Sequence, residues 1–131
     1  MPLYFGIAQS SDRIKKILRL IINCKNTNVE SKSYFPEALY KYGCNDEAYK
    51  CLMELLSPTL KRREYPEVSY AAIGSIAAGM MGIKPNSQYK LVETVSRLTS
   101  DVEWAAIKYL PVFKNEITVE HNGSYESALT S

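Results

Sequence analysis

The chain has 131 residues, and 16 basic against 14 acidic side chains give it a formal net charge of +2. A chain of this length forms one domain, or one domain with a small appendage, and buries about two-thirds of the surface of its unfolded state. The balanced charge excludes an extended basic surface for nucleic acid or for an acidic membrane. The one dense basic cluster, Lys61-Arg62-Arg63, is followed at once by Glu64 and is typical of a solvated turn.

The cysteines and the single histidine give little support for metal or thiol chemistry. Cys24, Cys44 and Cys51 are odd in number and form no Cys-x-x-Cys arrangement, so reduced thiols are expected. His121 lies in a strand-like run, where a lone histidine is more often a surface or packing residue than a catalyst. No apolar stretch reaches the roughly 18 residues of a membrane span, and no signal sequence is visible. We expect no metal, no cofactor, no nucleic acid and no membrane partner, and the cellular location stays open.

In chain order, a short apolar lead at residues 3–7 is followed by the first predicted helix. This helix begins near Ser11, which is a suitable cap. Its apolar residues recur at steps of three and four, as on the buried face of a helix: Ile14, Ile17, Leu18, Ile21 and Ile22. The polar residues 26–32 are predicted to form a loop.

An aromatic-Pro-Glu tripeptide then occurs twice, as Phe35-Pro36-Glu37 and Tyr65-Pro66-Glu67. Proline is favoured at the first helical position, and the following carboxylate complements the positive end of the helix dipole. Each tripeptide therefore predicts a helix start. The first of these helices should end at Gly43 and the second at Gly82, because glycine is the usual residue just past a helix end.

Two further features describe this helical region. Asn45 is predicted to cap a helix that ends before Pro58, which makes residues 43–45 a tight turn between two helices. The helix after Pro66 is rich in alanine, glycine and serine, so it is expected to be buried. Its interior glycines each cost about 1 kcal/mol relative to alanine, and close approach of a neighbouring backbone is the expected compensation.

The pattern changes to short apolar runs from Tyr89 onward, which predicts β structure. Lys114-Asn115 is a candidate hairpin turn, and Asn122-Gly123 is the strongest hairpin signal in the chain. The segment around Trp104 is either one helical turn or a strand. We therefore predict a mainly α fold, with helical hairpins at residues 1–86 and a short β-rich segment at residues 87–131.

Glu37 and Glu67 are the candidate catalytic residues. If stacked hairpins form a ring, helix starts of one layer surround a central cleft. Both carboxylates would then face a pocket lined by Tyr34, Phe35, Tyr65 and Tyr70. Paired carboxylates supply the acid and base of glycoside hydrolysis, and aromatic rings stack on sugars. For any one of these residues alone, the plainer interpretation is that the glutamates complement helix dipoles at the surface and the tyrosines belong to the core.

The order of these motifs resembles a known family. The segments Tyr-Phe-Pro-Glu-Ala-Leu-Tyr-Lys-Tyr-Gly and, at residues 69–85, Ser-Tyr-Ala-Ala-Ile-Gly-Ser-Ile-Ala-Ala-Gly-Met-Met-Gly-Ile-Lys-Pro are similar to the last hairpins of six-hairpin, (α/α)6-toroid glycoside hydrolases of the α-L-rhamnosidase-like kind. The resemblance implies a partial toroid, because a complete one needs about twelve helices. It implies a late carboxylate at Glu67, or alternatively Glu37, with Trp104 as an added sugar platform.

The resemblance implies part of a carbohydrate-active enzyme that hydrolyses O-glycosyl bonds and is inactive, or only binds sugar, in isolation. The alternative is a non-enzymatic helical module that associates with itself. Carbohydrate is the expected ligand, and a homodimer or the remaining hairpins of a toroid are the expected protein partners.

Overall fold

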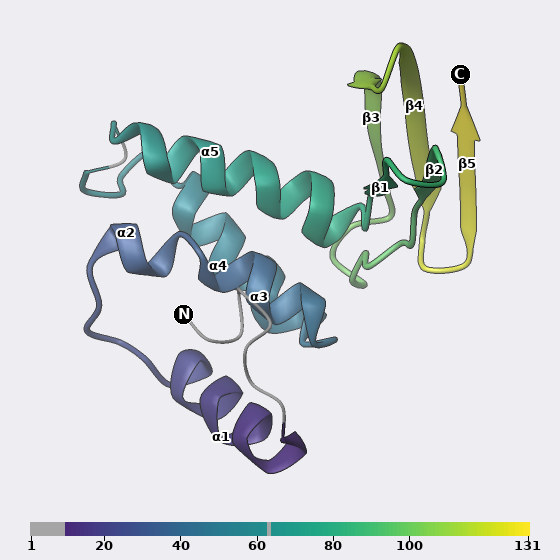
Figure 1. Ribbon diagram of the computed structural model, residues 1–131. Helices are drawn as coiled ribbons and strands as arrows, with labels where there is room; N and C mark the ends of the chain where they lie inside the picture. Colours follow the sequence, from purple (N-terminus) through teal and green to yellow (C-terminus); the bar gives the residue numbers. More distant parts are fainter. Residues whose placement is uncertain (1–9, 63) are drawn as a thin grey trace.

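The computed structural model describes residues 10–62 and 64–131, with helices preceding strands along the chain (Figure 1). The predicted apolar lead at residues 3–7 lies outside the described residues. The helices are α1 (Ser11–Ile22), α2 (Val29–Lys32), α3 (Phe35–Lys41), α4 (Asn45–Leu56) and α5 (Pro66–Gly74), which continues as the π-helical segment η1 (Ser75–Met80). The strands are β1 (Lys84–Asn86), β2 (Leu91–Glu93), β3 (Trp104–Val112), β4 (Asn115–Asn122) and β5 (Glu126–Thr130).

One apolar core joins the helices. Residues four apart on α4, Ala48 and Leu52, face the same side and pack toward α3, as helical periodicity requires. The other fully buried members come from α1, α3 and α5: Ile21, Phe35, Ala38, Leu39, Tyr40 and Ala72. Helix α1 contributes only Ile21 to the buried set. Its other apolar residues are either partly buried or, like Leu20 and Ile22, exposed, so α1 lies at the margin of the core.

Helix α3 lies close against the long helix formed by α5 and η1, and Gly79 is the glycine that this approach requires. A Cβ atom added at Gly79 would lie 2.7 Å from Cδ2 of Tyr40, and one at Gly74 would lie 3.6 Å from a carboxylate oxygen of Glu37. An added Cβ atom at Gly79 would clash with the Tyr40 side chain, so Gly79 is where α3 approaches the long helix most closely.

The strands form two antiparallel sheets. β1 and β2 make a two-stranded hairpin, and β3, β4 and β5 follow one another in a three-stranded sheet. A second apolar core lies between the end of η1 and the inner face of the larger sheet, and it contains Met81, Ile83, Val112, Ile117 and Val119. In Figure 1 the long helix runs from the helical region to these sheets, which stand together at its end.

The prediction of a mainly α fold with a partial toroid is wrong. Of the described residues, 41% are helical and 23% are in strands, so the protein belongs to a mixed class of helices and antiparallel sheets. The sequence pattern predicted the strands but underestimated how large a part of the fold they form. Because β3 and β4 pair over most of their length and bury a core of their own, the strands form a second half of the fold, and the expected short appendage does not describe them.

Several boundaries also differ from the prediction. Ser10, and not Ser11, caps α1, and Cys44, and not Asn45, is the N-cap residue of α4. The predicted loop at residues 26–32 contains α2, whose first turn is capped by the Asn28 side chain. The turn between β3 and β4 is one residue earlier than expected. The β4–β5 turn is formed by residues 123–125, so Gly123 begins it and Asn122, predicted to be part of it, is the last residue of β4. Trp104 lies in a strand. The predicted helix ends at Gly43 and Gly82 are confirmed, and both glycines have positive φ.

Candidate functional site

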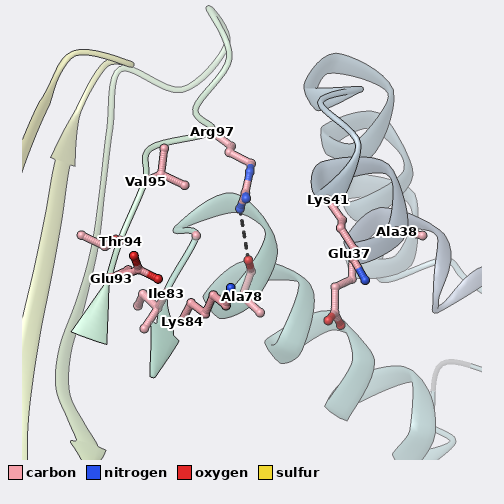
Figure 2. A pocket seen from close by; sticks show the side chains of 11 residues that line it. Glu37, Ala38, Lys41, Ala78, Ile83, Lys84, Glu93, Thr94, Val95 and Arg97 are labelled. Carbon is pink, nitrogen blue, oxygen red and sulfur yellow. Dashed lines mark hydrogen bonds between the residues drawn. The ribbon is translucent and has the colours of Figure 1, made fainter. Parts of the chain in front are cut away.

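A cavity of about 550 Å³ lies where the helical and strand regions meet. Helix α3 forms one wall, the end of η1 forms the base, and the opposite wall is the β1–β2 hairpin with residues 94–97 (Figure 2). The charged residues that line it are Glu37, Lys41, Lys84, Glu93 and Arg97. The apolar lining comes from small or branched side chains such as Ala38, Ile83 and Val95.

Glu37 and Lys41 enter the cavity from α3. They are four residues apart in the order Glu then Lys, so both side chains project from one face of the helix. Glu37 is half-buried, and one of its carboxylate oxygens would lie 3.6 Å from a Cβ atom added at Gly74, which is an ordinary van der Waals contact. The aromatic-Pro-Glu motif thus fixes this carboxylate at the start of α3 and at the edge of the cavity.

Arg97 holds the end of the long helix. Its Nη1 donates to the carbonyl oxygens of Ala78 at 3.2 Å and Gly79 at 2.8 Å, and its backbone N–H donates to Met80 at 3.0 Å. The last carbonyls of a helix have no intrahelical partner and carry its negative dipole end, so a cation is favoured there. Partial burial lowers the pKa of the Arg97 guanidinium. Arginine still remains charged at neutral pH.

Lys84 and Glu93 complete the charged lining. They are directly opposite each other in the β1–β2 hairpin, so both side chains project from the same face of its two strands. Figure 2 shows Glu93 on the wall opposite Glu37. Among the described residues, none of the five charged side chains around the cavity forms an ion pair.

The hairpin wall is attached to the helix by a tight approach at Gly82. This residue has φ +57°, and an added Cβ atom would lie 2.3 Å from the carbonyl oxygen of Val95. Nearby, the Thr94 hydroxyl donates to the Met81 carbonyl oxygen at 2.8 Å. These contacts set the position of Glu93 and Arg97 relative to α3.

The predicted pair of carboxylates is not brought together. Glu67 is exposed in the first turn of α5, seven residues before Gly74, which corresponds to about 10 Å along a helix. It does not line the cavity. The carboxylate that shares the cavity with Glu37 is Glu93, which sequence reasoning missed, as it missed Lys41, Lys84 and Arg97. The only signal available was the Glu37–Lys41 spacing, because the other contributions depend on how the hairpin folds back.

The predicted aromatic platforms also lie outside the cavity lining. Tyr34 and Tyr65 lie at the N-caps of α3 and α5, and the Tyr65 ring is 5.8 Å from the guanidinium carbon of Arg62. Tyr70 is 74% exposed on α5, and Trp104 is 67% exposed at the start of β3. These four residues therefore do not gather into one aromatic wall.

His121 is a structural residue of the sheet. It is 1% exposed, and its Nε2 lies 3.0 Å from the Met81 carbonyl oxygen while its Nδ1 lies 2.7 Å from the Ser127 hydroxyl. Because a carbonyl oxygen only accepts, the Nε2–H donates to it, and Nδ1 accepts from Ser127. The histidine thereby ties β4 and β5 to the end of the long helix.

Outside the cavity, the described residues also bear on thiol chemistry, metal binding and membrane spanning. Burial raises the pKa of the Cys51 thiol to about 11, which keeps it protonated and a weak nucleophile at neutral pH. The described residues contain no cluster of three or more side chains suited to holding a metal ion. Within that same part of the chain, every helix is too short or too polar to span a membrane.

Comparison with known proteins leaves the cavity as the main guide to function. No protein-family model matches the sequence, and neither a curated protein nor a solved structure matches it.

Proposed function

We propose that the chain is the sugar-binding part of a glycoside hydrolase-like protein, and that the cavity between α3 and the β1–β2 hairpin is its carbohydrate site. The observation that carries this proposal is the placement of two carboxylates, Glu37 and Glu93, on opposite walls of one cavity.

The lining suits a polyhydroxylated ligand. Sugar hydroxyls donate to carboxylate oxygens and accept from lysine and arginine N–H groups, and the cavity offers both kinds of partner. The C–H faces of a sugar ring pack against apolar side chains, here Ala38, Ile83 and Val95. Its volume of about 550 Å³ is within the range of small-molecule sites.

Binding without turnover is the activity that this arrangement supports best. A glycosidase acid is kept protonated by burial in an apolar pocket. Glu93 is exposed and Glu37 is only half-buried, so neither carboxyl group has such surroundings. We therefore propose that hydrolysis requires a further carboxyl group, and that the isolated chain has no useful glycosidase activity.

A nuclear magnetic resonance titration tests the proposal. Methyl β-D-glucoside and methyl α-L-rhamnoside would be added to the ¹⁵N-labelled chain. Shifts of amide signals are expected at residues 37–41 and 82–97, with smaller effects elsewhere. E37Q and E93Q should each weaken binding about fivefold or more, because each removes a charged acceptor.

E67Q is the matched control. It changes the same residue type in the other aromatic-Pro-Glu motif, outside the cavity, and should leave the titration unchanged. The proposal is overturned if neither sugar moves signals at the cavity, or if E67Q weakens binding as much as E37Q. Hydrolysis of an aryl glycoside that is lost in E37Q would contradict the claim of binding without turnover.

A second candidate is association of the chain with itself, because α5 exposes apolar side chains. Tyr70 is 74% exposed and Ile73 is 63% exposed, and their spacing of three places them on one face of the helix. Contiguous exposed apolar surface is typical of an interface. Sedimentation equilibrium tests this candidate: a dimer that dissociates in Y70S/I73S supports it, and a monomer at high concentration excludes it.

A further inference from the structure

We infer that the sugar recognised by the cavity carries a carboxylate, as a uronic acid does; this inference rests on the proposed function. The charged lining contains three cations and two carboxylates, so it has one positive charge in excess. A neutral sugar would leave that excess unmatched. A ligand with a single negative charge would neutralise it.

Arg97 is the residue best placed to receive the carboxylate. Its Nη1 is anchored on the carbonyl oxygens of Ala78 and Gly79, which fixes the position of the guanidinium group. Its Nη2 and Nε atoms form no hydrogen bond with the described residues. A guanidinium group presents its N–H donors in a planar fork that matches a carboxylate.

The cavity charges are also unpaired among themselves. The ion pairs of the described residues are Lys32–Glu54, Arg62–Glu30 and Lys108–Glu120, and none of them involves the cavity. Lys41 and Lys84 therefore remain available as further cations on the two walls, while Glu37 and Glu93 accept from sugar hydroxyls. One ligand with a carboxylate and several hydroxyls satisfies both sets.

A sugar phosphate fits this lining less well. A phosphate monoester carries a charge of roughly −1.5 to −2 at neutral pH, which exceeds the positive excess and places more negative charge beside Glu37 and Glu93. A carboxylate carries a single negative charge. The balance of charges therefore favours a uronate over a phosphorylated sugar.

The test compares two ligands that differ only at this group. Methyl β-D-glucuronide should bind the intact chain about tenfold more tightly than methyl β-D-glucoside, because charge-assisted hydrogen bonds are stronger than neutral ones. R97Q should lower glucuronide affinity about tenfold and glucoside affinity less than twofold. K41Q and K84Q should also lower glucuronide affinity more than glucoside affinity, but by smaller factors than R97Q. Because both lysines are exposed, these variants keep the inference testable if R97Q does not fold.

Lys15 on α1 is exposed and lies outside the cavity lining, so K15Q is the control and should bind both ligands as the unaltered chain does. Equal affinity for the two ligands would overturn the uronate inference and leave the sugar site standing. Absence of binding by either ligand would overturn both. Glucose 6-phosphate or inorganic phosphate binding as tightly as the glucuronide would show a general anion site and overturn the uronate assignment.

Discussion

The helical region, residues 10–80, and the strand region, residues 84–131, are stabilised by different kinds of contact. In the helical region, apolar side chains at helical spacing meet in a core, as Leu39 of α3 and Leu52 of α4 do. The strand region has a smaller core and is fastened to the helix end by polar groups, including His121 and Arg97. The first kind of contact leaves a periodic pattern in the sequence. The second joins residues far apart in the chain and leaves none.

The two regions meet at the C-terminal end of the long helix formed by α5 and η1, where its last carbonyl groups lie. The carbonyl oxygens of Gly79, Met80 and Met81 all accept hydrogen bonds from residues of the strand region. Terminal carbonyls without partners would be costly in a buried position. The strand region therefore supplies hydrogen-bond donors to the last carbonyl groups of the helix. In turn, the helix orients the β1–β2 hairpin that carries Glu93.

The largest expected effect comes from breaking this boundary at Gly82. Gly82→Ala should lower the free energy of unfolding by about 3 kcal/mol, because the residue has positive φ and its new Cβ atom would meet a backbone oxygen of Val95. Urea denaturation followed by circular dichroism measures the change.

Gly43→Ala is the control that measures the cost of a positive φ angle alone, without a steric clash. Gly43 also has positive φ, but no atom lies within 4 Å of an added Cβ atom. It should cost about 1 kcal/mol, in line with strain in the left-handed conformation. If the two substitutions cost the same, the close contact with Val95 does not hold the regions together.

An intermediate effect concerns the helical core, through the ionisation of Tyr40. Burial, with a smaller contribution from Tyr49, raises the pKa of Tyr40 from 10.0 to about 12. Between these pH values the unfolded chain loses the phenol proton while the folded protein keeps it, so stability falls as pH rises from about 10 to about 12. The loss attributable to Tyr40 should be about 1.4 kcal/mol at pH 11 and about 2 kcal/mol by pH 12.

Tyr40→Phe isolates this contribution. The Tyr40 hydroxyl is buried without a hydrogen-bond partner among the described residues, so its removal should also raise stability at pH 7 by about 1 kcal/mol. Urea denaturation of both proteins at pH 7 and at pH 11 gives the comparison. An unchanged alkaline loss in Tyr40→Phe would assign it to other groups, such as Cys51.

The two regions also differ in how far the sequence predicted them. Pro36, Pro66, Gly43 and Gly82 mark helix ends by local backbone chemistry, and these positions are confirmed. The extent of the sheets was underestimated because strand preference depends on packing against neighbouring strands more than on local sequence. In addition, β3 departs from regular register at a bulge between Ile107 and Leu110.

The residues of the candidate site also divide into those that local sequence predicts and those that the fold brings together. Glu37 was identified from its local motif, whereas Glu93 and Arg97 are brought opposite α3 by the fold of the chain at Gly82 and by bonds to the helix end. Glu67, identified by the same motif as Glu37, lies elsewhere. A repeated motif thus predicted two helix starts, but it contained no information on whether the two starts face one another.

The smallest expected effect tests the local signals at the first helix. The side chain of Ser10 accepts a hydrogen bond from the backbone N–H of Arg13 at 3.3 Å, whereas Ser11 is the first residue of α1 and is exposed. Ser10→Ala should lower the free energy of unfolding by about 0.5 kcal/mol, at the low end for an N-cap, because α1 buries only Ile21. Ser11→Ala, the matched control, should change it by less, since alanine is a better helix former and no cap is lost. Thermal unfolding of the two variants side by side measures the difference. A larger loss in Ser11→Ala would place the start of the helix one residue later and would show that the position of this cap, too, depends on contacts beyond the local sequence.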